Sequence, residues 1–224
     1  MPELNLTHEL VLLAYDDQGV NRLGTPNLDQ GLGGALLLEL ALAGRVEVTD
    51  GRLAVADPTP TGQPLLDEAL VRIRTESRPR RPQDWITRLG RGLREQVLDE
   101  LVAAGVLRRE AGRVLGVFPR TRFPSRTGAE PVVETEARQR MRTAVTTDGP
   151  VDPRTAALIG LTRALDLHRK VFRDLPKEQV ARRIAEIGAG DWASAATRRA
   201  VQETQMAIIT ATSTAAIIAT TTVS

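Results

Sequence analysis

The sequence predicts a mainly α-helical fold, organised as a single domain over residues 1–224 with short β-hairpins. Three features of the chain favour this class. Apolar residues recur at helical spacing along most of the sequence. One segment, GLGGALLLELALAGR, is apolar almost all round and is typical of a deeply buried helix. Finally, no linker is long enough to divide the 224 residues into separate domains.

Periodicity and capping signals place most of the elements. Thr7 is expected to be the N-cap of the first helix, and Pro153 behind Asp152 suits the first turn of a later one. Polar connections are expected over residues 21–30, 77–83 and 118–132. Helices are expected over residues 7–14, 31–45, 65–76, 91–104, 133–145, 152–172, 176–188 and 206–224.

One supersecondary unit occurs twice, first as ELALAGRV and again, 61 residues later, as ELVAAGVL. This offset carries the helix-ending Gly44 onto Gly105. In the first copy two short strands flank Asp50-Gly51, a dipeptide typical of a two-residue hairpin turn. The same offset carries Gly51 onto Gly112. Each copy is therefore expected to run from helix to glycine, strand, tight turn and strand.

The composition is that of a globular protein expected to stay in the cytoplasm. The net charge is +2, and 28 of the 30 basic residues are arginine, whose guanidinium groups suit phosphate. There is no cysteine, which excludes disulfides and thiolate metal sites. The first residues, MPELNLTHEL, lack the features of a signal peptide. The uncharged end from Met206 to Ser224 is diluted by threonine and serine, which favours a buried helix over a membrane span.

Residue types that carry catalysis or hold metals form no recognised pattern. His8 and His168 are far apart, and neither belongs to a two-histidine metal motif or a catalytic triad. The acidic pairs at residues 67–68 and 99–100 are expected to be solvated helix faces. The sequence therefore predicts a protein that is not an enzyme and needs no cofactor or metal.

Three glycines, Gly31, Gly33 and Gly34, lie together at the start of the leucine-rich segment. A phosphate-binding loop would need a strand before them and a lysine after them, and the sequence has neither. We therefore expect these glycines to let a helix pack closely against a neighbour or to adjust where the helix starts.

Two arginines precede the apolar stripe of the second repeat copy. Arg91 and Arg94 are three residues apart, so on one helix they would share a face. They could be solvated charges, a nucleic-acid contact or a clamp for a smaller anion. A winged-helix reading would make this helix a DNA-recognition helix, with arginines at positions 108, 109 and 113 on the wing. The acidic residues within the helix, including Asp99, disfavour it because they would repel phosphate.

The return strand of the second hairpin has a nearly continuous apolar run, made up of Val114, Leu115, Val117 and Phe118. It could be a strand buried on both faces. Alternatively, it could be an apolar loop that dips into a bilayer, with arginines at positions 120, 122 and 126 attracted to anionic lipid. The pattern leaves both interpretations open.

Several stretches, taken together, resemble the Golgi phosphoprotein 3 family. They are LTHELVLLAYDDQG, GLGGALLLELALAGR, PTGQPLLDEAL, DWITRLG, LREQVLDELVAAGVL and DPRTAALIGLTRALDL, and they cover nearly the whole chain in order. The resemblance implies a mostly helical domain with one protruding apolar hairpin. Members are peripheral membrane proteins that bind phosphatidylinositol 4-phosphate, act as adaptors for cytosolic tails of glycosyltransferases, and can oligomerise through the hairpin.

The resemblance also implies residue roles. The family's paired headgroup arginines fall on Arg91 and Arg94, and its apolar hairpin falls on residues 114–118. Two other headgroup positions depart from the pattern, because the family's tryptophan falls near Gly24 and its third arginine falls on Gly33. The arginine-rich, cysteine-free composition and the shortened loops indicate a bacterial homologue. The sequence thus predicts a protein that docks on anionic membrane lipid and does not bind nucleic acid, with membrane-protein tails as further partners.

Overall fold

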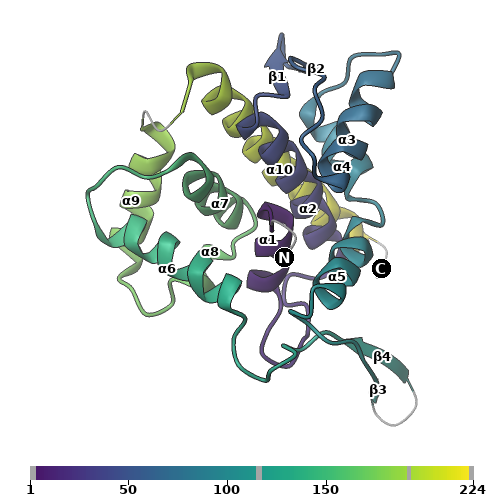
Figure 1. Cartoon of the computed structure of the whole chain (residues 1–224). Helices are drawn as coiled ribbons and strands as arrows, with labels where there is room; N and C mark the ends of the chain where they lie inside the picture. The colour runs from purple at the N-terminus through teal and green to yellow at the C-terminus, as the bar shows by residue number, and fades with distance from the viewer. Residues whose placement is uncertain (1–3, 115–117, 191–192, 222–224) are drawn as a thin grey trace.

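The computed structural model describes residues 4–114, 118–190 and 193–221, and it is mainly helical, as the sequence predicts (Figure 1). The helices are α1 (Leu6–Ala14), α2 (Thr25–Leu42), α3 (Pro64–Thr75), α4 (Pro82–Gly90), α5 (Leu93–Ala103), α6 (Val132–Thr146), α7 (Pro153–Ala164), α8 (His168–Val171), α9 (Lys177–Ala189) and α10 (Ala195–Thr221). The strands β1 (Val46–Thr49) and β2 (Arg52–Val55) form one antiparallel hairpin, and β3 (Glu110–Val114) and β4 (Phe118–Arg122) form another.

Helix α2 lies in the middle of the fold and packs against α1, α4 and α10. Its leucines Leu28, Leu32, Leu37, Leu38 and Leu40 are fully buried. Each contributes about 1.5–3 kcal/mol through the apolar surface it removes from water. The predicted deep burial is confirmed. The predicted start at residue 31 is wrong, because the chain enters the helix at Thr25, where a proline in the first turn favours helical backbone.

The glycines of α2 let neighbouring helices come into backbone contact. A Cβ on Gly33 would lie 2.2 Å from the carbonyl oxygen of Ile86 in α4. A Cβ on Gly90, at the end of α4, would lie 2.2 Å from the carbonyl oxygen of Asp29 in α2. On the side facing α10, a Cβ on Gly34 would meet the side chain of Ile208 at 2.3 Å. Close packing is therefore the role of these glycines, as the sequence predicts.

The first helix is capped two residues earlier than expected. Asn5, not Thr7, is the N-cap, and its side-chain oxygen accepts from the Thr7 amide at 3.0 Å. His8 completes the cap, because its Nδ1 accepts from the Asn5 amide at 3.2 Å. Its Nε2 lies 3.0 Å from Glu100 on α5. Asparagine is a better N-cap residue than threonine, and Asn5 precedes the apolar run whereas Thr7 lies inside it. The helix therefore begins at Leu6.

Two carboxylates that were expected to be solvated instead have structural partners. Glu100 meets the nearly buried His8, as described above. Asp67 accepts from the Thr61 amide at 2.6 Å and the Gly62 amide at 3.1 Å, and so holds the loop before α3. The prediction is wrong at these two positions because helical periodicity reveals neither partner: His8 is 92 residues from Glu100, and Thr61 and Gly62 lie in the loop before α3.

The repeat is confirmed where its helices end but not at its second turn. Gly44 and Gly105 both adopt the left-handed backbone that favours glycine, with φ of 67° and 73°. Asp50-Gly51 forms the turn of the first hairpin as expected. Gly112, however, pairs with Arg120 inside the second hairpin, whose last pair is Val114 with Phe118. The predicted loop over 118–132 therefore begins with a strand.

The predicted helix over residues 152–172 is interrupted. α7 starts as expected, with Asp152 accepting from the Thr155 amide at 2.9 Å and Pro153 in the first turn. It ends at Ala164, and Asp166 then takes a left-handed backbone, with φ of 57°. Aspartate tolerates that region better than most residues, so the chain turns there before the short α8.

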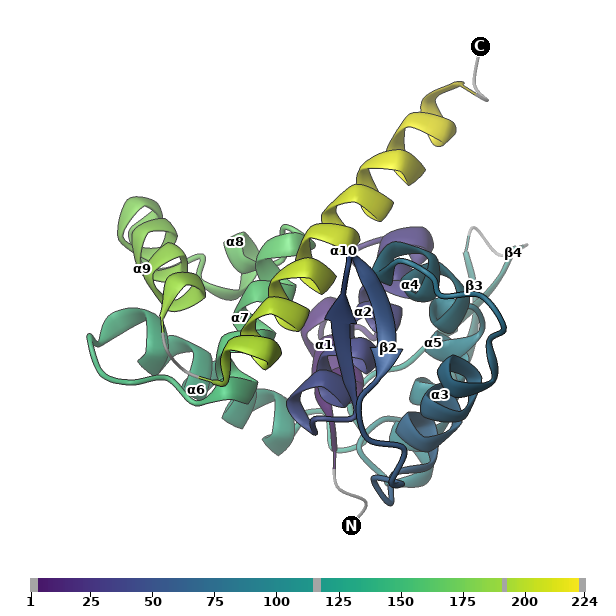
Figure 2. The same ribbon diagram turned by 90° about the horizontal axis from the view of Figure 1, so that it is seen from above.

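The last helix lies along α2 and then extends beyond the body of the molecule (Figure 2). It begins at Ala195, earlier than the predicted residue 206. One side of it is buried, including Val201, Thr204 and Ile208, whereas Met206 is 62% exposed. The expected C-terminal helix is therefore buried along one face. Within the described ranges, no helix has the length and apolar character needed to span a bilayer.

Substituting Gly33 tests the backbone contact between α2 and α4. Gly33→Ala should lower the free energy of unfolding by about 1–3 kcal/mol, because the added methyl group forces the two helices apart. Gly188→Ala in α9 is the matched control, since no atom lies within 4 Å of its added Cβ. It should be neutral or stabilising by about 0.5–1 kcal/mol. Urea unfolding of both variants measures this, and equal stabilities would contradict the contact.

His8 should make stability depend on pH. Burial, aided by the charge of Arg154, lowers the pKa of His8 from 6.5 to about 4. Between these values the unfolded chain binds the proton more readily. The free energy of unfolding should therefore fall as pH drops from about 6.5 to 4, by up to about 3 kcal/mol. Urea unfolding across this range should show a weaker fall for His8→Gln. Parallel pH profiles for the parent and the variant would rule out this contribution.

Candidate anion-binding surface

The excess of positive over negative charge is concentrated in two segments. Residues 72–91 contain seven arginines against Glu76 and Asp84, and residues 108–126 contain six arginines against Glu110. Each segment has five positive charges in excess on a chain whose net charge is only +2. The first segment covers the end of α3, α4 and the start of the turn into α5, and the second covers β3 and β4. Both lie on the same side of the molecule in two perpendicular views (Figures 1 and 2).

Arg91 and Arg94 do not share a helix. α4 ends at Gly90, Arg91 is its C-cap, and Gly92 begins α5 with a left-handed φ of 76°. The predicted common helix face is wrong because this glycine reverses the backbone between the two arginines. The two side chains consequently have different neighbours.

Arg94 pairs with a partly buried carboxylate. Its Nε lies 3.3 Å from Oδ1 of Asp29 on α2, and its Nη2 lies 3.3 Å from Glu95. The Nε and Oδ1 atoms are both buried and are not aligned as a hydrogen bond, so the contact is an ion pair. Burial raises the pKa of Asp29, and the Arg94 charge opposes that rise. Arg94 thus helps to hold α5 against α2.

Arg91 is exposed and forms no ion pair with the described residues. It lines two adjoining grooves between α3, α4 and α5, of about 620 and 210 Å³. Arg72 lines both grooves as well, and Arg88 lines the larger one. Arg88 pairs with Glu76 at 2.9 Å and lies over the ring of Trp85 at 6.0 Å. Arg72, Arg88 and Arg91 are therefore the arginines that line these grooves.

The positions that depart from the family pattern have structural explanations. Gly33 faces the backbone of α4, so no side chain fits there. Gly24 is the N-cap of α2 with a φ of 77°, a conformation that disfavours larger residues. Gly33 therefore leaves no room for a side chain, whereas a Cβ on Gly24 would have no atom within 4 Å.

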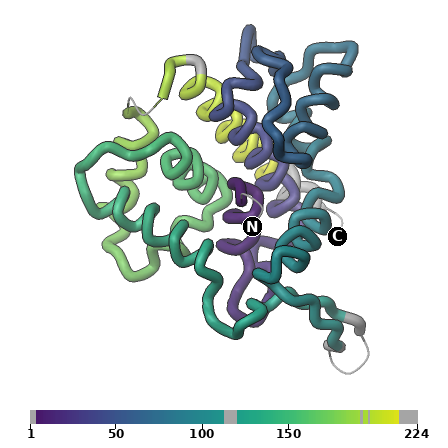
Figure 3. Tube along the Cα trace, in the orientation of Figure 1, coloured from purple at the N-terminus to yellow at the C-terminus, as the bar shows by residue number. Residues whose placement is uncertain are grey.

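The second hairpin is anchored at its base and projects from the helices, as the tube view makes clear (Figure 3). Phe123 is buried and packs edge-on against Tyr15, with ring centroids 6.2 Å apart. Its amide donates to the carbonyl of Gly19 at 2.9 Å. Ala111 and Thr121, on the two strands, are exposed, so this part of the hairpin is not a core element.

Two of the four apolar hairpin residues lie at the far end of these strands. Val114 and Phe118 are the last residues that pair. Leu115 and Val117 fall outside the described residues. Their predicted insertion into lipid therefore remains a prediction.

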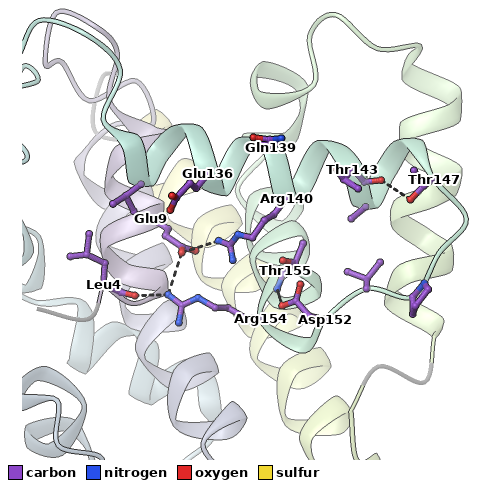
Figure 4. Close-up of a pocket in the computed structure, with 14 residues that line it drawn as sticks. Leu4, Glu9, Glu136, Gln139, Arg140, Thr143, Thr147, Asp152, Arg154 and Thr155 are labelled. Carbon is purple, nitrogen blue, oxygen red and sulfur yellow. Dashed lines mark hydrogen bonds and ion pairs between the residues drawn. The ribbon is translucent and has the colours of Figure 1, made fainter. Parts of the chain in front are cut away.

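A separate groove of about 840 Å³ lies between α1, α6 and α7 (Figure 4). Its centre is Glu9, whose Oε1 accepts from Arg140 at 2.9 Å and from Arg154 at 3.2 Å. Arg154 also donates to the carbonyl of Leu4 at 2.7 Å. The carboxylates of Glu136 and Asp152 line the same groove. Because acidic residues outnumber basic ones here, this groove suits an anion less well than the surface around Arg91.

The sequence did not single out Arg72, Arg88 or Trp85. They lie on two helices that are joined by the connection at residues 76–81, and only the fold brings them together with Arg91. A signal was present, since the excess of arginine over residues 72–91 can be counted in the sequence. It could not indicate which of these arginines share a groove.

Comparisons with known proteins agree with the fold. The family model described as Golgi phosphoprotein 3 (GPP34) matches residues 6–204. Vacuolar protein sorting-associated protein 74 of Eremothecium gossypii is 32% identical over 134 aligned residues. That alignment covers 49% of this chain and 40% of the fungal protein, so the chain matches less than half the length of that relative.

Separate substitutions should distinguish the two arginines. Arg94→Ala should lower the free energy of unfolding by about 1–3 kcal/mol, because it leaves the partly buried Asp29 without its cation. Arg91→Ala should change it by less than about 0.5 kcal/mol. Adding Asp29→Asn to Arg94→Ala should recover part of the loss. Thermal and urea unfolding measure these effects, and an Arg94→Ala variant as stable as the parent would contradict the structural role.

Proposed function

Because this chain belongs to the Golgi phosphoprotein 3 family, we propose that it is a peripheral membrane protein that binds anionic phospholipid headgroups. The observation that carries the proposal is the concentration of positive charge on the side formed by α3, α4 and the β3–β4 hairpin. An anionic membrane attracts each basic residue near its surface by about 1 kcal/mol. The unpaired Arg91 would contact phosphate, and Val114, Leu115, Val117 and Phe118 would enter the acyl boundary.

The identity of the lipid, the adaptor role and the mode of oligomerisation are proposed by analogy with the family. The lipid would be phosphatidylinositol 4-phosphate or a similar anionic lipid, and the protein would act without catalysis as an adaptor for cytosolic tails of membrane proteins. It would lie on the cytosolic face of the membrane. Oligomers would form through the hairpin. The departures at Gly24 and Gly33 imply that any headgroup is held differently from the family pattern.

The alternative of a winged-helix nucleic-acid-binding protein is disfavoured by the exposed face of α5. That face carries Glu95 and Asp99, which would meet the phosphates of a duplex. The arginines of the supposed wing are also engaged, since Arg108 pairs with Glu110 at 2.8 Å and Arg109 pairs with Asp99. Retardation of a DNA fragment at low salt would revive this alternative.

Vesicle sedimentation tests the proposal. The parent protein should bind phosphatidylcholine vesicles that contain an anionic lipid, bind vesicles of phosphatidylcholine alone weakly, and release as salt rises. Arg91→Ala should weaken binding about fivefold, which corresponds to about 1 kcal/mol. Arg182→Ala is the matched control, because this arginine is 75% exposed on α9, away from the proposed surface. Phe118→Asp should release the protein without unfolding it.

Two results would contradict the proposal. The first is a parent protein that binds neutral and anionic vesicles equally. The second is a loss of binding that is the same for Arg91→Ala and Arg182→Ala, since this would mean that only total charge matters.

A further inference from the structure

We infer that Arg72, Arg88, Arg91 and the indole N–H of Trp85 form a binding site for a phosphate monoester. This inference rests on the proposed function in naming the headgroup chemistry, and it assigns the site to residues of α3 and α4. We call these four residues the α3–α4 site. The shared ligand chemistry is a phosphate with one ester bond, carried either by a lipid or by a soluble molecule.

The geometry begins with the two adjoining grooves. Trp85, Arg88, Glu76 and the end of α3 line the larger one, and Arg72 and Arg91 line both. A group held near Arg91 is therefore also beside Arg72, on a different helix.

An unpaired donor accompanies these arginines. Trp85 is 3% exposed, and its Nε1 is buried without an acceptor among the described residues. Indole nitrogen can only donate a hydrogen bond, and a buried donor without an acceptor is costly. Trp85 lines the larger groove, so the acceptor that we infer for this donor is an oxygen of a ligand bound there. A ligand that brings only donors would leave it unsatisfied.

The ion pairs around the grooves also favour an anionic ligand. Arg91 has no carboxylate partner among the described residues, whereas Arg72 makes a long ion pair, 3.9 Å, with Glu68, which also lines the smaller groove. Glu76 is occupied, because it accepts from Arg80 at 3.2 Å and from Arg88 at 2.9 Å. Hydrogen bonding from Arg80 is the main reason that the pKa of Glu76 lies below its usual value, so this carboxylate stays charged and positions Arg88. Arg91 and the indole N–H of Trp85 are therefore the groups without a partner among the described residues, and Arg72 and Arg88 lie beside them in the same grooves.

A phosphate monoester fits these requirements better than a diester. It carries about 1.5–2 negative charges at neutral pH and three terminal oxygens that accept hydrogen bonds. Guanidinium groups bind such oxygens in pairs. A phosphodiester offers one charge and two such oxygens, and so leaves more of these donors unsatisfied. Arg94 is held by Asp29 and is not free to bind a ligand. In the α3–α4 site, Arg72 and Arg88 would supply the further positive charge.

Calorimetry with a soluble probe tests the site independently of any membrane. Glycerol phosphate should bind the parent protein at one site. Arg72→Ala should weaken that binding at least about fivefold, because a charge-assisted hydrogen bond is lost. Arg74→Ala is the matched control, since it removes the same charge two residues away on the same helix, and both arginines are exposed. It should change the affinity less than about twofold. Circular dichroism should show that both variants are folded.

Trp85 provides a second, direct readout. The chain has two tryptophans, so Trp192→Phe leaves Trp85 as the only one. Glycerol phosphate should then change its fluorescence in a saturable way, and Arg72→Ala should shift the midpoint as it shifts the calorimetric affinity. A response absent in the folded Trp192→Phe protein, or an equal loss in Arg72→Ala and Arg74→Ala, would overturn the inference.

Vesicles separate this inference from the proposed function. Both are supported if Arg72→Ala weakens binding to vesicles containing phosphatidic acid, a phosphomonoester lipid, more than to vesicles containing phosphatidylserine. If glycerol phosphate binds but no vesicle does, the site stands for a soluble ligand and the membrane proposal fails. If vesicles bind the parent and Arg72→Ala equally, the membrane proposal stands and the α3–α4 site is wrong.

Discussion

The contact on which the rest of this fold depends is the crossing of α2 and α4, where two glycines bring the backbones together. Gly33 faces the carbonyl of Ile86, and Gly90 faces the carbonyl of Asp29, each without room for a side chain. This crossing ends α4 near the start of α2 and sets where the chain must turn into α5. Protein interiors pack as densely as organic crystals. Such a close approach of two backbones therefore leaves little freedom in the placement of α4. Trp85 and Arg88 are positioned as a consequence.

The same crossing gives Arg91 and Arg94 different surroundings. Asp29 is drawn against the end of α4, where burial raises the pKa of its carboxyl group, and Arg94 supplies the opposing charge. Gly92 then turns the chain so that Arg91 lines the groove beside α3 instead. An arginine that balances a buried carboxylate contributes mainly to stability, whereas an exposed and unpaired one remains free for a ligand. Two residues that look equivalent in the sequence therefore differ in role.

Much of the fold could be predicted from the sequence, because local patterns encode it. The all-round apolar character of α2 predicted its burial, and Asp50-Gly51 and the glycines after α2 and α5 predicted turns that the structure confirms. Failures occurred where a distant partner decides the outcome. The contact of Glu100 with His8, 92 residues away, is one such case. The same is true of the groove, which joins residues from α3, α4 and the turn that follows. The Thr25 start of α2 is an exception, because Pro26 in its first turn is a local signal.

The distribution of charge bears on how such a protein would meet a membrane. The ten positive charges in excess on the two arginine-rich segments are balanced mainly by residues 1–71, which contain eleven acidic residues and three arginines. The acidic part includes the β1–β2 hairpin, which lies at the opposite end of the view from β3 and β4. A nearly neutral protein with separated charge feels little net attraction at long range, but it is turned by the field of a charged surface within about a Debye length, roughly 10 Å. The first arginine-rich segment lies beside the β1–β2 hairpin, since the Leu53 amide donates to the Arg80 carbonyl, so the separation of charge acts mainly on the β3–β4 hairpin, which an anionic bilayer would turn toward itself. Orientation of this kind lets a modest number of contacts act together, because the apolar hairpin end and the arginines reach the surface in the same encounter.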